Sequence, residues 1–211
     1  MPGSEFPAAQ PLRAGYCTVP NPIHPQQVAR ISLRPQDVDV LILCSRNPLP
    51  LFPHLEELDE RGYRYYFHVT LMDNPRLIDR KAPALETALV TFRRLSARVS
   101  PQRMIWRYDP LVFSEITPPE FHRRTFETIA RSLDGHTRRV MVSIVDMYAK
   151  TRRRLLSLEQ HGARLIPFHP QKDAWFGQAR LNHARHDPAS PSLLGWLEPT
   201  LQQEEGQMRL F

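Results

Sequence analysis

Runs of residues that predict β-strands alternate with helical patterns through the middle of the chain, and this alternation constrains the fold more than any other feature. The strand-like runs span residues 38–44, 63–71, 103–109 and 138–146. The helical patterns that follow them span residues 51–62, 82–99, 117–135 and 148–162. Strict alternation favours a parallel sheet joined by right-handed crossovers. A partial (β/α) barrel and a doubly wound sheet both satisfy it.

The individual patterns predict where several elements begin and end. Residues 38–44, VDVLILC, form a near-continuous apolar run, which is expected of a strand buried on both faces. Pro110 predicts the end of the third strand, because proline has no N–H to offer a sheet ladder. Thr117 is predicted as the N-cap of the third helix, with Pro118 just inside it. Residues 163–168, ARLIPF, predict a fifth strand.

Length and turn chemistry predict one domain with irregular ends. A chain of 211 residues is long enough for one sizeable α/β domain. Residues 15–33 read as two short strands around a proline-rich turn, which predicts a hairpin. We therefore expect an α/β fold, a partial (β/α) barrel with about five parallel strands and an N-terminal β-hairpin. The domain is expected over residues 12–186, after a disordered or vector-derived start at 1–11 and before an extended tail at 187–211.

The charge balance favours an anionic partner. Lys and Arg number 28 against 22 Asp and Glu, which gives a formal net charge of +6, and most of the cations are arginine. Arginine suits phosphates and carboxylates, so a nucleotide or nucleic acid is favoured. An arginine-rich composition also follows from a GC-rich genome, and this alternative stays open. We expect no membrane span, because no run of about 18 apolar residues occurs.

Cofactor motifs are missing from the sequence. It has no Walker loop, no dinucleotide-binding glycine pattern and no nucleophile elbow. Its two cysteines, Cys17 and Cys44, are far apart and not in a metal-type spacing. We therefore expect no metal and no cofactor, and the absence of a signal peptide predicts a cytoplasmic protein.

Polar side chains cluster near the carboxyl end of each predicted strand, and these ends lie on one side of a parallel sheet. The predicted site therefore combines Arg46 and Asn47 after the first strand, His68 and Thr70 in the second, Arg107 and Asp109 in the third, and Asp146 in the fourth. We expect them to converge on one cleft.

The residue types define a limited chemistry. Arg46 and Arg107 are predicted to clamp an anion, with Asn47 and Thr70 as further ligand contacts. Asp109, Asp146 and His68 are candidate general acids or bases. Purely structural roles stay open as alternatives: Arg107 and Asp109 as an ion pair, His68 as a core histidine, and Asp146 as a helix cap.

Four segments together resemble a known family. NPIHPQQVARISLRPQDVDVLILCSRNP, YYFHVTL, MIWRYDP and VSIVDMYAKTRR are similar to the bacterial family catalogued as domain of unknown function eighteen-forty-eight, over roughly residues 12–155. The resemblance implies a barrel like that of radical S-adenosylmethionine enzymes, with a C-terminal cysteine cluster for an iron–sulfur centre. It carries over Asn47, Pro48, Thr70, Arg107, Asp109 and Asp146 as residues of the barrel mouth.

This chain departs from that pattern in ways that leave two functions open. It starts with MPGSEFPAAQ where the family has a strand similar to SRRTDIP, and two cysteines are too few for a cluster with three or four cysteine ligands. One hypothesis is an enzyme that binds a nucleotide or nucleic-acid-like substrate. The other is a shortened, non-catalytic adaptor, and an exposed sheet edge would favour a homo-oligomer.

The last five residues, QMRLF, suggest a partner. They resemble the short peptides by which many bacterial proteins bind the DNA sliding clamp, with Gln207 hydrogen-bonded and Leu210 and Phe211 in an apolar pocket. Such recruitment would indicate a role in DNA repair. The alternatives are a chance match, or Leu210 and Phe211 docked on the domain itself.

Overall fold

The computed structural model of the protein describes residues 9–145 and 149–166. The helices are α1 (Ala9–Ala14), α2 (Leu55–Glu60), α3 (Leu85–Val99), α4 (Pro119–Ser132) and α5 (Ala149–Glu159), with short 3₁₀ turns at Pro35–Asp37, Leu49–His54 and Pro101–Arg103. The strands are β1 (Tyr16–Pro20), β2 (Val28–Ser32), β3 (Leu41–Ser45), β4 (Tyr65–Thr70), β5 (Met104–Leu111) and β6 (Val140–Ile144). Helix α1 was not predicted, because its six residues carry no periodic apolar pattern.

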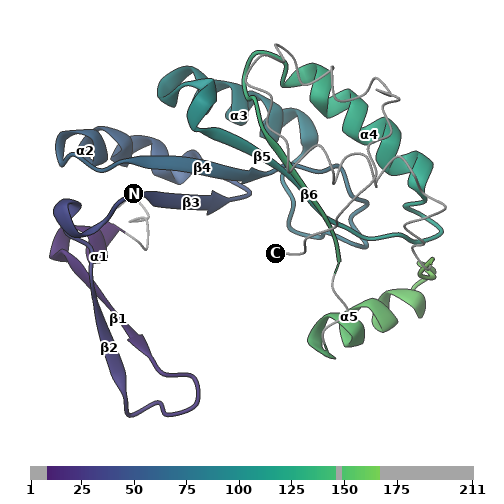
Figure 1. Cartoon of the computed structure of the whole chain (residues 1–211). Coiled ribbons are helices and arrows are strands. Elements are labelled where there is room, and N and C mark those ends of the chain that lie inside the picture. Colours follow the sequence, from purple (N-terminus) through teal and green to yellow (C-terminus); the bar gives the residue numbers. More distant parts are fainter. Residues whose placement is uncertain (1–8, 146–148, 167–211) are drawn as a thin grey trace, which may run out of the picture.

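The strands form two sheets, as the sequence predicted. Strands β3 to β6 make a four-stranded parallel sheet in the order β3-β4-β5-β6. Strands β1 and β2 pair as an antiparallel hairpin that projects from the body (Figure 1). The α/β class and the hairpin are thus confirmed. Within residues 9–145 and 149–166 the parallel sheet is open, and no closed barrel is seen.

One face of the parallel sheet packs against helices. Figure 1 shows α2, α3 and α4 on one side of the sheet, with the hairpin and α5 on the other. Odd-numbered residues of β4 and even-numbered residues of β5 point into the core, among them Phe67, Trp106 and Tyr108. They meet apolar residues of the three helices, such as Phe92 and Phe126. We call this side the helix-packed face.

The residues of opposite phase make the second face of the sheet. The strand register aligns Ile42, Cys44, Tyr66, His68, Thr70, Ile105, Arg107, Asp109, Met141 and Ser143 on it. Its exposure falls from the β3 edge, where Ile42 is 50% exposed, to β5, where Asp109 is 7% exposed. Parallel sheets are usually covered on both faces, so a partly exposed second face is unusual.

The prediction that the first strand is buried on both faces was wrong. Strand β3 is the edge of the sheet and pairs only with β4, and its residues alternate between half-buried and exposed. An unbroken apolar run shows that a strand can be buried on both faces. Which helices cover it depends on the rest of the chain.

Two predicted boundaries were also wrong. Strand β5 continues through Pro110 to Leu111, because the pairing with β6 shifts register between Tyr108 and Leu111 and so does not need an N–H from Pro110. The N-cap of α4 is Pro118, without a side-chain cap. The Thr117 hydroxyl instead donates to the carbonyl of Val112 at 2.7 Å.

The predicted fifth parallel strand is not seen in the part of 163–168 that the structure describes. There Leu165 forms an isolated antiparallel bridge with Ser114. The Ile166 N–H also donates to the carbonyl of Phe113 at 3.0 Å, so this segment is tied to the loop after β5. The sequence signal for an extended segment was correct, but its partner and direction were not.

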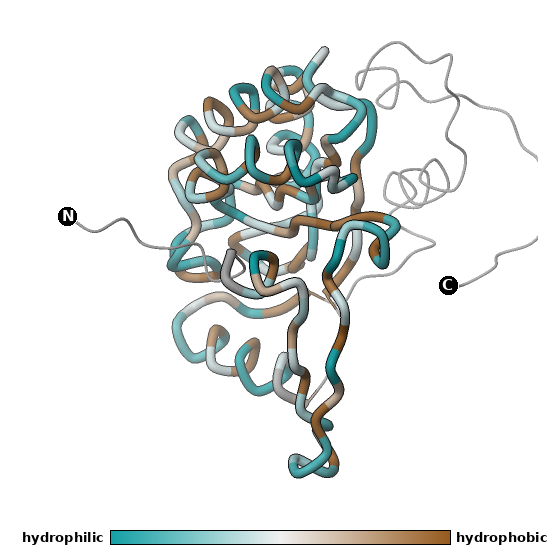
Figure 2. The backbone as a smooth tube through the Cα atoms, turned by 90° about the vertical axis from the view of Figure 1, so that its left-hand side faces the viewer, coloured by the Kyte–Doolittle hydropathy of each residue, from teal (hydrophilic) through white to brown (hydrophobic). Residues whose placement is uncertain are grey.

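The hairpin exposes apolar side chains. Figure 2 shows apolar stretches along it, away from the layered body. Val19, Val28, Ile31 and, at the turn, Ile23 are exposed, and Ile23 is 79% exposed. Isolated two-stranded hairpins are marginally stable in water, so this arm gains little from its own contacts. Among the described residues, no helix is long and apolar enough to span a membrane.

Candidate functional site

An ion pair on the second face lies at the centre of the candidate site. An Arg107 Nη2–H donates to Asp109 Oδ2 at 2.6 Å, and the Asp109 side chain is 7% exposed while that of Arg107 is 32% exposed. The two residues point the same way because they are two apart on β5. The hydrogen bond to Asp109 is the main cause of a raised pKa of Arg107. The guanidinium is therefore charged throughout the physiological range.

This ion pair leaves two buried polar atoms without partners. Asp109 Oδ1 and Arg107 Nε are both buried and make no hydrogen bond in the structure. Buried polar atoms are normally hydrogen-bonded, and an unpaired one costs about 1–3 kcal/mol. A ligand with both a donor and an acceptor would satisfy Oδ1 and Nε together.

Neighbouring strands bring further polar groups to the ion pair. Thr70 is the register partner of Arg107, and Cys44 is the register partner of His68. The Ser143 hydroxyl on β6 donates to Asp109 Oδ2 at 3.4 Å, a long contact. The pair, with Cys44, His68, Thr70 and Ser143, forms what we call the second-face cluster. It joins His68, Thr70, Arg107 and Asp109 of the predicted site.

His68 is neutral in this cluster at neutral pH. Burial lowers its pKa, and the positive charge of Arg107 lowers it further, while Asp109 partly opposes them. A neutral imidazole offers one acceptor nitrogen and one donor N–H. His68 is therefore suited to accept a proton or a hydrogen bond from a ligand.

The arginine predicted after the first strand is already engaged. Arg46 forms an ion pair with Asp79, in the segment between β4 and α3. Asn47 Oδ1 accepts the Leu49 N–H at 3.3 Å, which stabilises the local turn. Arg46, Thr70 and Asp79 line a hollow of only about 10 Å³, too small for a ligand. The Arg46 guanidinium is thus paired with Asp79, while that of Arg107 is paired with Asp109. A clamp of both arginines on one anion stays a prediction.

The remaining predicted residues are not placed. Asp146 lies in the gap between the described ranges, and Gln207, Leu210 and Phe211 lie beyond Ile166. Cys44 was missed as a site residue. It is two residues from Ile42 on β3, so it lies on the same face, and its register partner on β4 is His68. Ser143 was not included in the predicted site either.

The cysteines of this chain do not fit an iron–sulfur cluster. Cys17 is on the hairpin and Cys44 is on the parallel sheet, and both are free thiols. The full sequence has only these two. Within the described residues, no three His, Cys, Asp or Glu side chains are grouped to hold a metal ion. A cluster with three or four cysteine ligands would need thiolates from outside this chain.

The fold and the cluster together define an α/β protein whose parallel sheet packs helices on one face and carries a polar site on the other. The chain belongs to the family described as Domain of unknown function (DUF1848), whose model matches residues 8–182. This confirms the resemblance drawn from the sequence motifs. No curated protein and no solved structure matches the chain.

Proposed function

We propose that this protein binds an anionic, nucleotide-like or nucleic-acid-like ligand at the second-face cluster, near the carboxyl ends of the strands. The observation that carries the proposal is the buried Asp109 carboxylate, whose Oδ1 has no partner beside the equally unpartnered Nε of Arg107. A phosphate oxygen can accept from Arg107 while a ligand hydroxyl or amine donates to Asp109.

The surroundings of the ion pair support this kind of ligand. Thr70 and Ser143 supply hydroxyl groups, and the neutral His68 supplies a donor and an acceptor. The net charge of +6 attracts anions to the molecule as a whole. If the protein is an enzyme, Asp109, His68 and Asp146 are the candidate acids and bases.

The arrangement of layers supports the proposal of a partial (β/α) barrel. In a barrel of that type the helices lie outside and one face of the sheet lines the interior. The second face would be that interior, which explains why it combines apolar and polar residues. Asp146 follows β6 directly in the sequence and would join the site there.

Binding can be tested with a panel of nucleotides and short oligonucleotides by isothermal titration calorimetry. We expect one class of phosphate ligand to bind and Arg107→Gln to weaken it about tenfold, the value of one charge-assisted hydrogen bond. Arg138→Gln is the matched control, because Arg138 is exposed before β6 at the other end of the sheet. No binding by the intact protein, or equal weakening in both variants, would contradict the proposal.

A second proposal, an adaptor recruited to the DNA sliding clamp in the cytoplasm, rests on the QMRLF sequence. Leucine and phenylalanine anchors in a preformed pocket give such peptides their affinity. Titration of the clamp with the intact protein and with a Leu210→Ala, Phe211→Ala variant decides it. Equal binding by both proteins, or none, rejects the clamp proposal and its link to DNA repair.

Self-association is proposed from the exposed apolar arm. Val19, Ile23, Val28 and Ile31 of the hairpin and Ile42 at the β3 edge are all exposed. Apolar groups of this extent on the surface favour an interface. Light scattering should give twice the monomer mass, and Ile23→Ser with Val28→Ser should return it to the monomer. A monomer at all concentrations would refute this proposal.

A further inference from the structure

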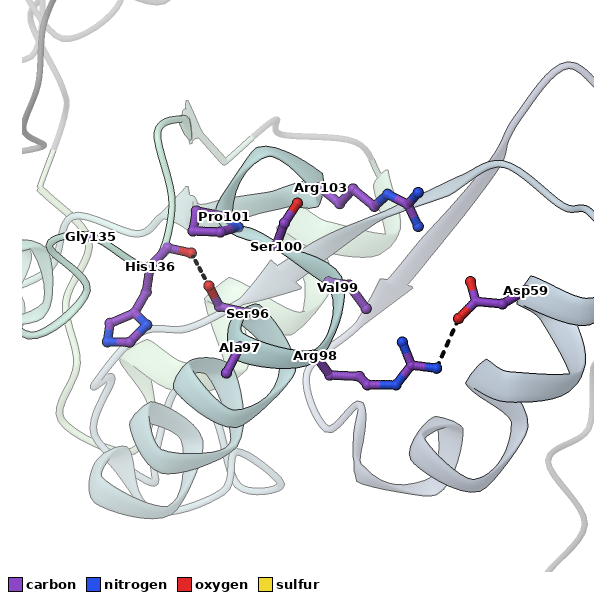
Figure 3. A pocket seen from close by; sticks show the side chains of 10 residues that line it. All are labelled: Asp59, Ser96, Ala97, Arg98, Val99, Ser100, Pro101, Arg103, Gly135 and His136. Atoms are coloured by element: carbon purple, nitrogen blue, oxygen red, sulfur yellow. Dashed lines mark hydrogen bonds and ion pairs between the residues drawn. The ribbon is translucent and has the colours of Figure 1, made fainter.

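A hollow of about 730 Å³ lies at the opposite end of the sheet from the second-face cluster. It is formed where α3 ends and β5 begins, with Asp59 of α2 on one side and His136 on the other (Figure 3). Arg103 directly precedes β5, so about 20 Å of strand separates this hollow from Asp109. Its volume is within the range typical of small-molecule sites.

Two guanidinium groups line this hollow, and only that of Arg98 is hydrogen-bonded to the Asp59 carboxylate. Figure 3 shows Arg98 and Arg103 extending to the same side, toward Asp59. Arg98 donates to Asp59 Oδ2 at 2.8 Å, and Tyr65 donates to Asp59 Oδ1 at 2.8 Å. Arg103 lies over the Tyr65 ring, 5.3 Å from its centroid, and forms no ion pair within the described residues.

Among the described residues that line the hollow, two arginines accompany one carboxylate, that of Asp59. The Asp59 carboxylate already accepts from Arg98 and Tyr65. Burial raises the pKa of Tyr65 to about 12, helped by its hydrogen bond to Asp59, so the phenol stays neutral. Arg98 also offsets the negative C-terminal end of α3. Arg103 acts on Asp59 through its charge alone, so its N–H groups are left for a ligand.

The backbone at this hollow is strained. Ser100 has φ 85° and ψ 151°, and it is the one non-glycine residue with positive φ among those described. That region is strongly disfavoured for any residue with a Cβ, and such strain concentrates at functional sites. Ser100 lies between Arg98, near the end of α3, and Arg103, which directly precedes β5, so the chain turns at this residue between the two arginines.

We propose that this hollow binds the phosphate group of a small phosphorylated molecule. Arg103 is the principal anion contact, the Ser100 hydroxyl is a second donor, and Arg98 supplies a further N–H beside its bond to Asp59. The described residues that line the hollow include no Phe, Tyr or Trp side chain, and the imidazole of His136 is the one ring on which a base could stack, so a sugar phosphate suits it better than a nucleic acid. This site is separate from the second-face cluster and does not depend on the function proposed there.

Calorimetry with inorganic phosphate, ribose 5-phosphate and ribose tests the proposal. We expect both phosphates to bind and ribose not to bind. Arg103→Gln should weaken phosphate binding about tenfold through the loss of a charge-assisted hydrogen bond. Arg152→Gln is the control, because Arg152 is an exposed arginine on α5, far along the chain from the hollow, and should leave binding unchanged.

Two more variants separate binding from folding. Arg103→Lys keeps the charge without the planar fork and should retain part of the affinity. Ser100→Gly should raise the melting temperature by relieving strain, and should weaken phosphate binding because it removes the Ser100 hydroxyl. Phosphate binding that is absent, or that falls equally in Arg103→Gln and Arg152→Gln, overturns the proposal. Tighter binding of a short single-stranded oligonucleotide than of ribose 5-phosphate would reassign the site to nucleic acid.

Discussion

The two faces of the parallel sheet are built from the same strands, but one packs apolar side chains against helices and the other carries a polar cluster. On the helix-packed face Trp106 stacks on Phe126 with ring centroids 4.7 Å apart, and its Nε1–H donates to the Leu71 carbonyl at 2.9 Å. On the second face Arg107, the next residue, takes part in an ion pair with two unpartnered buried atoms. Trp106 thus belongs to a core in which its indole N–H is hydrogen-bonded, while the adjacent Arg107 belongs to a polar cluster with buried atoms that lack hydrogen-bond partners.

This difference shows where stability and chemistry lie. A buried aromatic side chain contributes through area and dispersion, and needs no specific partner chemistry. A buried ion pair costs desolvation and often stabilises less than apolar residues of the same size. We infer that the helix-packed face holds the fold together, and that the second face keeps its polar residues for a ligand.

The largest expected effect is on the helix-packed face. Trp106→Ala should lower the free energy of unfolding by about 3–5 kcal/mol, because it leaves a cavity beside Phe126 and an unpaired Leu71 carbonyl. Ile42→Thr at the exposed β3 edge should change it by less than about 0.5 kcal/mol. Urea unfolding followed by far-ultraviolet circular dichroism, a backbone signal that does not need Trp106, measures both. Similar losses in the two variants would show that both faces carry the fold.

The ion pair should give the next largest effect. Arg107→Met alone leaves the Asp109 carboxylate buried and unpaired, at a cost of about 2–4 kcal/mol after allowance for the partial exposure of Arg107. The double variant Arg107→Met, Asp109→Leu removes both charges and should be about as stable as the original protein.

Urea unfolding of the three proteins, with ligand titration alongside, tests this prediction. The double variant should keep the fold and lose the ligand proposed for the second-face cluster. A double variant less stable than Arg107→Met would mean that the pair is there for stability, contrary to the division drawn between the faces.

The smallest effect concerns a histidine on each side of the sheet. His122 of α4 is fully buried, with Nδ1 3.1 Å from the Tyr108 hydroxyl and Nε2 3.1 Å from the Val112 carbonyl. Burial lowers its pKa, opposed only by the hydrogen bond to Val112. His68 has a lowered pKa as well but is half-buried.

A lowered histidine pKa means that protonation disfavours the folded state. This contribution to stability is present above the ordinary pKa of about 6.5 and is lost as the pH falls through the folded-state value. We expect the free energy of unfolding to decrease as the pH falls below about 6.5. His122→Gln should flatten that dependence more than His68→Gln does, because His122 is the more buried. A larger flattening in His68→Gln than in His122→Gln would mean that the pH dependence of stability comes from His68 on the second face.

Local pattern predicted the elements of this fold well. The alternation gave β3 to β6 and α2 to α5 in order, because apolar periodicity is a property of neighbouring residues. Pattern failed where a distant segment decided the outcome. Thr117 bonds to Val112 across a loop rather than capping α4, and the strand-like 163–166 bridges to Ser114 in the antiparallel sense.

The candidate site was predicted in part for the same reason. His68, Thr70, Arg107 and Asp109 share a face because strand alternation and parallel register bring them together, and both follow from the sequence. The sequence did not predict that Arg46 is paired with Asp79, a carboxylate from another loop. No sequence pattern around residue 46 predicts that pairing.

The sequence by itself determined β3 to β6, α2 to α5, the hairpin and the phase of the side chains on each strand, since these depend on backbone sterics and on nearest neighbours. Only the tertiary structure decided that α2, α3 and α4 pack on one face, which leaves Ile42 exposed and Asp109 buried without a full set of partners. It alone also placed Arg98, Ser100 and Arg103 around one hollow. Burial of a side chain is set by what the whole chain brings to it, and no short segment contains that information.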